Sequence, residues 1–232
     1  MLRDGEWSRL FKEEFALFYS VFKWLVLAVV IGIFVGTAVS TFMLALEKCS
    51  NGVGSLPPWR ILLLPLGLLA SVSMVRYLKV ADSTQGTESV VEAVHHHQGR
   101  IDVYTVIVKV IAAVITISTG GSLGQEGPSA QIGSAVSNVF ATGFRLNDID
   151  RRKLVVCGVS AGMASVFGAP VAGAVFGLEV LYVGQVFYDV LLPCIVSGMV
   201  SYQVSLNLGM AYIYQPLLYI PKMTGLHVLL WV

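Results

Sequence analysis

Apolar residues near the start of the chain follow two patterns in succession. Between residues 6 and 18 they recur at helical spacing, at Trp7, Leu10, Phe11, Phe15 and Phe18, while the charged residues fall mostly on the other side. This pattern predicts an amphipathic helix on a membrane surface, so residues 1–22 are expected to form a surface helical region. Residues 24–46 then contain no charge, and 23 such residues are enough for a helix to cross a hydrocarbon core of about 30 Å.

The apolar stretches that follow differ in length. After a loop with Pro57 and Pro58, a second span is expected over about 61–75, and another over about 186–206. Between these two, glycine and proline break the apolar sequence into shorter pieces, which predict helices over 88–98, 103–119, 128–143, 148–167 and 170–182. Helices that stop inside a membrane are tolerated only where their ends line an enclosed or watery cavity, and in transporters they mark the binding site. These interruptions are the strongest indication of function in the residue pattern.

Composition agrees with a membrane location. The 232 residues are 56% hydrophobic and 12% charged, with a mean hydropathy of +0.76, whereas soluble domains carry about 25% charged residues. The fold class is therefore an all-α, multi-pass integral membrane protein, expected in the cell membrane. Lys and Arg are more frequent before the first span than in the loop after it, which favours a cytoplasmic N-terminus. A net charge of +1 without a basic and aromatic cluster gives no reason to expect a nucleic-acid partner.

Two acidic residues stand alone in long uncharged stretches. Glu126 is the only charge between Lys109 and Arg145, and Glu179 is the only charge between Lys153 and Asp189. An ionisable group at bilayer depth costs about 3 kcal/mol on insertion scales, so Glu126 is predicted to be functional. The alternative for Glu126 is a carboxylate that only caps the following helix. Glu179 is a secondary candidate, because an acid near a helix end can also be simply solvated or paired.

Glycine and proline next to Glu126 predict a helix start. Pro128 suits the first turn of helix 128–143, and the free N–H groups of that turn would point toward Glu126 and the preceding glycines. A helix N-terminus carries roughly half a positive charge and binds anions without a full cation. Protonation of Glu126 would then vacate this position and make anion access depend on pH.

Two further helix starts are expected in the membrane region. Thr87 or Ser89 can cap the helix over 88–98, and Ser89 with Glu92 fits a capping box. The Gly168-Ala169-Pro170 sequence precedes the last short apolar helix. Several helix N-termini are therefore predicted inside the membrane.

Two motifs carry a family resemblance. GSLGQEGPSAQIG resembles the GxxGxEGP signature of the chloride channel and chloride/proton antiporter family, and GVSAGMASVFGAPVAGAVFGLEV resembles its GxxxxFxAPxxGxxFxxE signature. Both occur in the order and spacing of the family, and the resemblance covers about residues 6–206. It implies that residues 23–232 form the first of the two inverted repeats of the family fold, with broken and re-entrant helices. It also implies a homodimer that transports chloride or a similar small anion, alone or with protons, and that needs no cofactor.

The resemblance assigns roles to individual residues. Glu126 stands at the external gating glutamate, and Glu179 matches the conserved acid of the second signature. The anion-binding residues that it implies are Gly86, Thr87, Gly124, Gly127 and Ala169. Neither signature implies a metal ion.

Three positions depart from the family pattern. Gln85 replaces the serine of the family's GSGIP segment, and Glu88 replaces its proline. Val180 stands where the antiporters have an internal, proton-handling glutamate. The sequence therefore leaves open whether the transported ion is chloride or fluoride, and whether the protein is a channel or an exchanger. The second repeat of the family, which normally completes the ion site, is absent from these residues.

Two other functions compete with anion transport. The chain is alternatively a non-conducting truncated half or a structural subunit. More remotely, residues 158–162 fit the G-x-S-x-G pattern of a serine hydrolase, with Ser160 as nucleophile. The glycines four residues apart at 158 and 162, and at 173 and 177, are instead typical of close helix packing in membranes.

Histidines and cysteines do not predict a metal site. His95, His96 and His97 are adjacent, so on a helix they point in different directions, whereas ligands on one helix need spacings of three or four. The cysteines lie far apart and are expected to be buried small side chains, at Cys49, Cys157 and Cys194.

Overall fold

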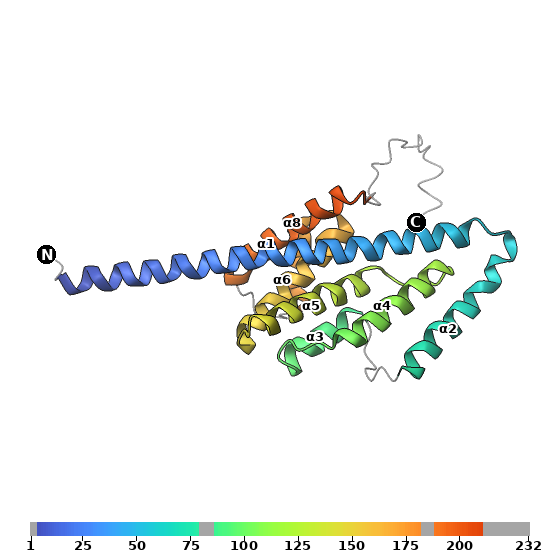
Figure 1. The fold of residues 1–232 in the computed structure, drawn as a ribbon, viewed down its shortest axis with the longest axis horizontal. Coiled ribbons are helices and arrows are strands. Elements are labelled where there is room, and N and C mark those ends of the chain that lie inside the picture. Colours follow the sequence, from blue (N-terminus) through green and yellow to red (C-terminus); the bar gives the residue numbers. More distant parts are fainter. Residues whose placement is uncertain (1–3, 79–85, 182–187, 211–232) are drawn as a thin grey trace, which may run out of the picture.

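A computed structural model describes residues 4–78, 86–181 and 188–210 (Figure 1). Within these ranges the chain is helical and contains no strand. The elements are α1 (Asp4–Gly54), the 3-10 helix η1 (Pro58–Leu62), α2 (Leu63–Tyr77), α3 (Thr87–His96), α4 (Val103–Ser118), α5 (Glu126–Gly143), α6 (Asp148–Phe167), α7 (Pro170–Leu181) and α8 (Tyr188–Asn207). The all-α class is confirmed for the described residues, and the predicted boundaries at 182 and 186 fall outside them.

Helices of two lengths are present, as the sequence predicts. Among the described residues, three segments are long and apolar enough to cross a membrane, namely Phe18–Gly54, Trp59–Tyr77 and Asp189–Asn207. In contrast, α4 has 16 residues and α7 has 12. At 1.5 Å per residue α7 is only about 18 Å long, well short of a hydrocarbon core of about 30 Å. As described, α7 is therefore too short to cross such a core by itself.

The first helix is longer than the pattern suggests. We expected a surface helix over residues 6–18 and a separate span over 24–46, but α1 continues without a break through both. No glycine or proline lies between residues 6 and 31, so nothing in the local sequence ends the helix there. Its N-terminal part extends beyond the bundle (Figure 1), and its position on a membrane surface stays a prediction.

Helix α6 forms the centre of the bundle. All of its residues from Leu154 to Val166 are buried, because α6 packs against α1, α5, α7 and α8. A helix that is buried on every side needs no polar face, and its sequence accordingly mixes aliphatic and small residues. One apolar cluster joins α6 to α3, α7 and α8, and a second joins it to α1, α4 and α5.

Small residues bring α5 and α6 into close contact. A Cβ added at Gly162, near the end of α6, would lie 2.6 Å from the carbonyl oxygen of Ser129, near the start of α5. The earlier Gly158 lies against Gly133 and Ser137, further along α5. The two helices are therefore antiparallel, and the packing role predicted for this glycine pair is confirmed.

The second glycine pair packs α7 against α6. Gly173 lies against Ala164 and Gly177 lies against Ser160, with a Cβ added at Gly173 only 2.8 Å from the Ala164 backbone nitrogen. Helix α7 is thus also antiparallel to α6. As a result, α5 and α7 begin at the same end of the bundle.

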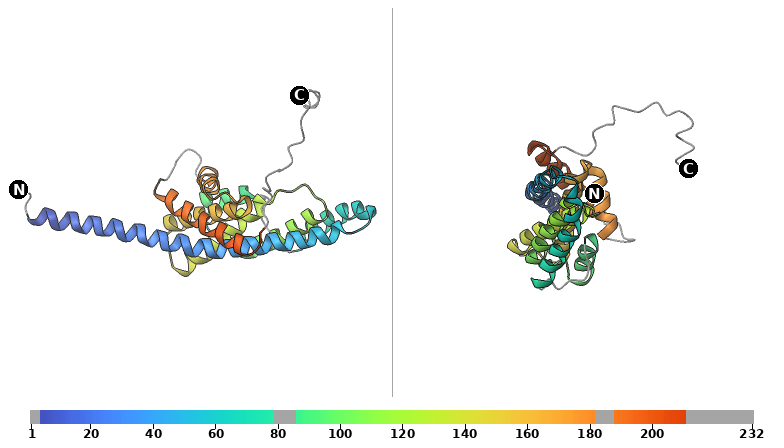
Figure 2. Two further views of the ribbon diagram at one scale, coloured as in Figure 1. Left: turned by 90° about the horizontal axis from the view of Figure 1, so that it is seen from above. Right: turned by 90° about the vertical axis from the view of Figure 1, so that its right-hand side faces the viewer.

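Helices α1 and α8 lie side by side in both Figures 1 and 2. Gly32 and Gly36 of α1 approach the α8 backbone at Ser197 and Ser201, where an added Cβ would lie 2.7 and 2.8 Å from the carbonyl oxygens. Because later residues of α1 meet later residues of α8, the two helices run in parallel. Apolar side chains remain exposed on the outer helices, as on α2 at Leu66, Leu69 and Val72, which suits contact with lipid.

Candidate functional site

Glu126 is the first residue of α5 and its side chain is exposed. We predicted that this helix begins at Pro128, and the prediction is wrong by two residues, since Gly127 and Pro128 are its second and third residues. Proline fits there because the first N–H groups of a helix have no intrahelical partner. The carboxylate lies in the first turn, where the helix dipole favours negative charge.

The carboxylate of Glu126 folds back over Gly124. A Cβ at residue 124 would overlap with the carboxylate carbon and both of its oxygens. The absence of a side chain at Gly124 therefore makes room for the acid in this position. The structure thus brings together the predicted gating residue and one predicted anion-binding glycine.

The starts of α3 and α5 lie against each other. A Cβ added at Gly127 would be 2.9 Å from the Cα atom of Gly86, which is the N-cap residue of α3. Gly86 has φ 68°, a left-handed conformation that glycine adopts without the cost of a Cβ. Thr87 is the first residue of α3. Two helix N-termini, more than 35 residues apart in sequence, therefore meet next to Glu126.

Gln131 holds this contact in place, and our sequence analysis did not identify it. Its buried side-chain nitrogen donates to the carbonyl oxygen of Gly86 at 3.2 Å and to the hydroxyl of Ser89 at 2.8 Å. Ser89 in turn donates to the same Gly86 carbonyl at 2.9 Å. The sequence did contain a signal for Gln131, which is a side-chain amide among small and apolar residues of α5. Because buried polar side chains are nearly always hydrogen-bonded, such an amide indicates a specific partner.

The predicted capping of α3 is wrong. Neither Thr87 nor Ser89 is the N-cap residue, and the N-cap position has no side-chain hydrogen bond. Ser89 lies in the first turn and donates backward, so it does not form a capping box with Glu92. Gly86 suits the cap because its left-handed backbone conformation, with φ 68°, is one that residues with a side chain rarely adopt. Residues 84 and 85 lie outside the described ranges.

Ala169 lies in the turn between α6 and α7. Gly168 ends α6 in a left-handed conformation with φ 65°, and Pro170 begins α7. The neighbour of this turn is α8, where a Cβ added at Gly198 would lie 3.1 Å from the Pro170 carbonyl oxygen. Ala169 therefore shares the end of the bundle at which α3 and α5 begin.

Glu179 does not lie with Glu126. It is an exposed residue near the C-terminal end of α7, beside the half-buried Val180. Nine residues separate Glu179 from Pro170, which is about 14 Å along a helix. Because α5 and α7 begin at the same end, Glu179 is displaced toward the opposite end of the bundle.

Ser160 has the wrong surroundings for a hydrolase nucleophile. It is fully buried in the middle of α6, where Gly177 packs against it. The nucleophile elbow requires an exposed serine on a sharp turn between a strand and a helix. The continuous helix around Ser160 contradicts the hydrolase alternative.

These features define a class of protein: a helical membrane protein in which short helices begin beside an exposed acidic residue at one end of the bundle. Residues 66–232 match the family described as voltage gated chloride channel, and the chain belongs to this family. Members of the family are channels or transporters, which agrees with the expectation that the chain is not an enzyme.

Two relatives show how much of the family fold the chain covers. A chloride/fluoride channel protein of Pseudomonas syringae pv. tomato (strain DC3000) is 35% identical over 200 residues, which are 86% of this chain and 44% of that protein. The voltage-gated ClC-type chloride channel ClcB of Escherichia coli O139:H28 is 30% identical over 199 residues, which are 80% of this chain and 47% of that protein.

Two solved structures share the fold. The crystal structure of a CLC-type fluoride/proton antiporter superposes with a TM-score of 0.74 at 24% identity, covering 89% of this chain and 51% of that one. A slow cyanobacterial Cl-/H+ antiporter superposes with a TM-score of 0.65 at 20% identity, covering 81% and 47%. The chain thus spans about half the length of the relatives that it matches, and it corresponds to their N-terminal half.

Proposed function

We propose that this chain provides the anion-binding and gating elements of a membrane anion transporter, with Glu126 as the gate. The observation that carries the proposal is the contact between Gly86 and Gly127, which places the N-termini of α3 and α5 together beside the Glu126 carboxylate. Chloride or fluoride would bind to the backbone N–H groups at these two helix starts. Family membership supports the same conclusion.

Electrostatics favours an anion at this position. Each helix N-terminus contributes about half a positive charge, and two that meet attract one small anion without a bound cation. The interaction is strongest where lipid or protein replaces water, because a low dielectric weakens screening. Gly124 and Gly86, which are not buried, carry no side chain that would hinder close approach to the backbone, as expected of a site made from N–H groups.

Glu126 competes with the mobile anion for this potential. When ionised, its carboxylate occupies the favourable position at the start of α5. Protonation removes its charge, and with it the attraction that holds it there. We therefore infer that anion flux rises as the pH on the side facing Glu126 falls, and that the proton enters the transport cycle through this residue.

Glu126→Gln tests the gate. Glutamine has nearly the same size but no titratable proton, so anion flux from liposomes should lose its pH dependence while flux itself persists. Glu47→Gln is the matched control, because Glu47 is an exposed acid on α1. Wild-type protein and the control should both change flux several-fold across the pH range. A Glu126→Gln variant with the wild-type pH profile would rule out the gating role.

The same liposome assay can identify the transported anion and show whether its transport is coupled to protons. The names of the relatives include chloride and fluoride and both channels and proton antiporters. Comparing chloride with fluoride efflux, with proton movement recorded alongside, assigns the ion and the coupling. Wild-type protein without flux of either anion would favour the alternative of a non-conducting structural subunit.

Assembly and location are part of the proposal. We expect a homodimer in the cell membrane, as the family resemblance implies. Cross-linking in native membranes before detergent extraction tests this, and a monomer alone under conditions that cross-link a known dimer would contradict it.

A further inference from the structure

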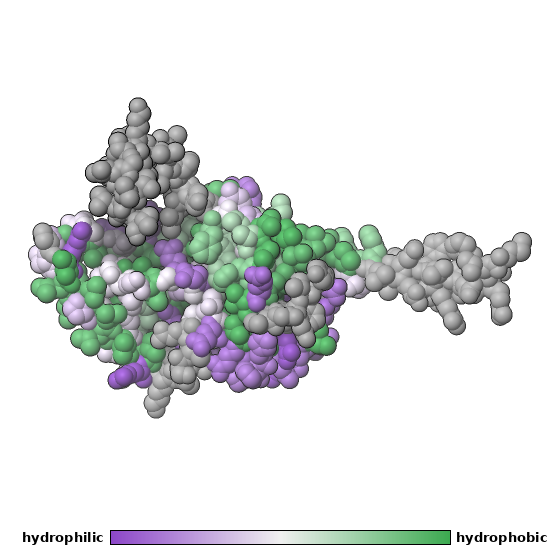
Figure 3. All heavy atoms as spheres, turned by 180° about the vertical axis from the view of Figure 1, so that it is seen from behind, coloured by the Kyte–Doolittle hydropathy of each residue, from purple (hydrophilic) through white to green (hydrophobic). Residues whose placement is uncertain are grey.

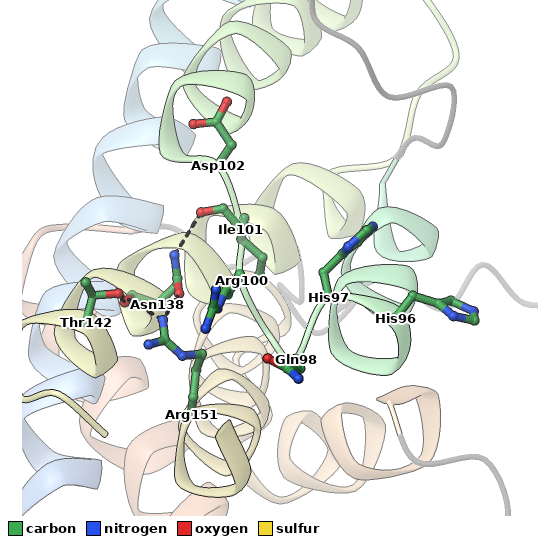
Figure 4. Close-up of a pocket in the computed structure, with 9 residues that line it drawn as sticks. All are labelled: His96, His97, Gln98, Arg100, Ile101, Asp102, Asn138, Thr142 and Arg151. Carbon is green, nitrogen blue, oxygen red and sulfur yellow. Dashed lines mark hydrogen bonds between the residues drawn. The ribbon is translucent and has the colours of Figure 1, made fainter. Parts of the chain in front are cut away.

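A polar pocket of about 750 Å³ opens at the other end of α5 (Figure 4). Three connected parts of the fold form it: the α3–α4 connection, the C-terminal part of α5 and the start of α6. Its lining is rich in cationic and amide side chains and consists of His96, His97, Gln98, Arg100, Ile101, Asp102, Asn138, Thr142 and Arg151. Nothing in the gate at Glu126 requires these residues.

Arg151 is held in a fixed orientation in this pocket. One of its terminal nitrogens donates to the side-chain oxygen of Asn138 at 2.8 Å and to the hydroxyl of Thr142 at 2.9 Å. Asn138 is fixed in turn, since its amide donates to the carbonyl oxygen of Ile101 at 2.8 Å. These hydrogen bonds, drawn in Figure 4, restrict the orientation of the guanidinium group, and both of the acceptors, Asn138 and Thr142, are uncharged. Its charge is therefore positioned without being neutralised.

A tight turn brings a second arginine to the same place. Gln98 and Gly99 both have positive φ, 57° and 76°, and the backbone N–H of Arg100 donates to His97 at 3.0 Å. A left-handed glutamine is uncommon, so this turn is maintained by its surroundings. Gly99 rests against α6, where an added Cβ would be 3.5 Å from the Arg151 side chain. Arg100 and Arg151 both line the pocket (Figure 4).

Two acidic residues near the pocket, Asp102 and Asp148, have partners other than Arg151. The Asp102 carboxylate already accepts hydrogen bonds from the Tyr104 and Thr105 N–H groups at the start of α4. Asp148 pairs with Arg100 at 3.7 Å, but both side chains are well exposed, and exposed pairs contribute little. Among the described residues no carboxylate pairs with Arg151, so its guanidinium stays available to an anion.

The pocket is separate from the predicted anion gate. Asn138 and Thr142 follow Gly127 by 11 and 15 residues in α5, which corresponds to roughly 17 to 22 Å along the helix. Figure 3 shows hydrophilic residues gathered toward the end of the molecule from which α1 extends, with apolar residues over much of the same face. Exposed apolar side chains also lie close to the pocket in sequence, at Tyr104, Val139 and Phe144. This combination is typical of the boundary between lipid and water.

We propose that this pocket binds a phosphate group, supplied by an anionic phospholipid headgroup or by free phosphate. Two arginines line this one pocket, and a guanidinium group binds phosphate oxygens in a bidentate manner that lysine cannot reproduce. Amide and hydroxyl groups at the rim satisfy the remaining oxygens. A basic pocket at the membrane boundary also lies at the depth of lipid headgroups.

Binding of radiolabelled inorganic phosphate to the purified protein in mild detergent tests the site. Arg100→Gln removes an exposed charge that no helix depends on, and it should weaken phosphate binding about fivefold or more, as expected for one basic contact. Arg151→Lys keeps the charge but loses the fork geometry, so it should also weaken binding. Arg145→Gln is the control, because Arg145 is exposed on the α5–α6 connection but does not line the pocket.

A second measurement distinguishes the two sources of phosphate. Protein reconstituted in phosphatidylglycerol with phosphatidylcholine should retain phosphatidylglycerol through purification, and Arg100→Gln should reduce the retained quantity. Retention of the lipid identifies a headgroup site, and phosphate binding without lipid retention identifies a site for free phosphate. The proposal is overturned if Arg145→Gln weakens binding as much as Arg100→Gln, or if chloride at equal ionic strength displaces phosphate completely. It is overturned equally if neither phosphate nor lipid binds.

Discussion

At the scale of single residues, missing side chains decide how the candidate site is built. Gly124 makes room for the Glu126 carboxylate, and the contact between Gly86 and Gly127 sets the distance between two helix starts. Gln131 then fixes that contact with hydrogen bonds to the α3 start. The site therefore depends on close backbone approach as much as on its one acid.

Gly127→Ala should separate the starts of α3 and α5. The added methyl group would lie 2.9 Å from the Gly86 Cα atom, and this neighbour is backbone that cannot rotate away. Overpacking of this kind costs about 1–3 kcal/mol of stability, and anion flux should fall further than the quantity of folded protein. Flux per folded molecule, from liposomes with matched protein content, measures the effect.

Gly143→Ala provides the control for this substitution. Gly143 ends the same helix, and an added Cβ there meets no atom within 4 Å. Flux and stability should stay at wild-type values or improve slightly, since alanine favours helix. Equal losses of flux in both variants would show that the contact between the helix starts is irrelevant to transport.

At the scale of elements, the starts of α4, α6 and α7 followed from local sequence, but those of α3 and α5 did not. The predicted helix over 148–167 coincides with α6, and the prediction over 103–119 exceeds α4 by one residue. At the start of α3, where we expected a capping side chain, Gln131 of α5 bonds to Gly86 and Ser89 instead. A local pattern contains the capping side chains but not the neighbouring helix that replaces them.

The start of α4 shows a conventional side-chain cap that can be tested. Asp102 accepts from the Tyr104 and Thr105 N–H groups at 3.2 and 3.1 Å, and from the Thr105 hydroxyl at 2.7 Å. The hydrogen bond from the Thr105 hydroxyl is the largest effect that lowers the pKa of the Asp102 carboxyl. Because the folded protein has the lower pKa, the stabilisation is present at neutral pH and is lost as the pH falls through that lowered value.

Asp102→Ala should therefore lower the free energy of unfolding by about 1 kcal/mol at neutral pH, as is typical for a lost N-cap. Asp102→Asn should cost less, because its side-chain oxygen still accepts the backbone N–H groups. Thermal unfolding in detergent at neutral and acidic pH measures both. The difference between wild type and the alanine variant should shrink in acid, and a difference that is constant with pH would contradict an ionised cap.

At the scale of the whole molecule, helix directions separate two functional ends. Helices α3, α5 and α7 begin at the end with Glu126, while the phosphate pocket lies where α5 ends and α6 begins. Lys23 of α1 pairs with Asp150 of α6 at 3.2 Å, so the pocket end is also the end at which α1 enters the bundle. A cytoplasmic N-terminus places the pocket on the cytoplasmic side and turns the Glu126 end toward the outside.

Thiol labelling tests this sidedness with a cysteine of the chain itself. Cys49 is exposed, which corrects our expectation that it is buried, and it follows Lys23 by 26 residues in the continuous α1. That separation is about 39 Å, more than a hydrocarbon core. A membrane-impermeant maleimide should label Cys49 from outside intact cells, and Cys49→Ser should abolish labelling because Cys157 and Cys194 are buried.

Asn147→Cys in the Cys49→Ser background supplies the opposite control. Asn147 is the exposed N-cap residue of α6, three residues from Asp150. Its thiol should react only after the membrane is permeabilised. Labelling of both positions from the same side would contradict the helix directions or the crossing of α1.

The sequence alone determined the membrane class and the approximate lengths of the interrupted helices, and it singled out Glu126 as a candidate, because hydropathy, helix breakers and isolated charges are local properties. It also contained two family signatures, and family membership is confirmed. Only the tertiary structure decided that Gly86 meets Gly127, with Gln131 bonded across the contact, and that Arg100 and Arg151 line one pocket. These contacts join residues about 40 to 50 positions apart, so they depend on how helices pack rather than on any nearby pattern. The candidate residue Glu126 could therefore be named from the sequence, while the arrangement around it required the packing of α3 against α5.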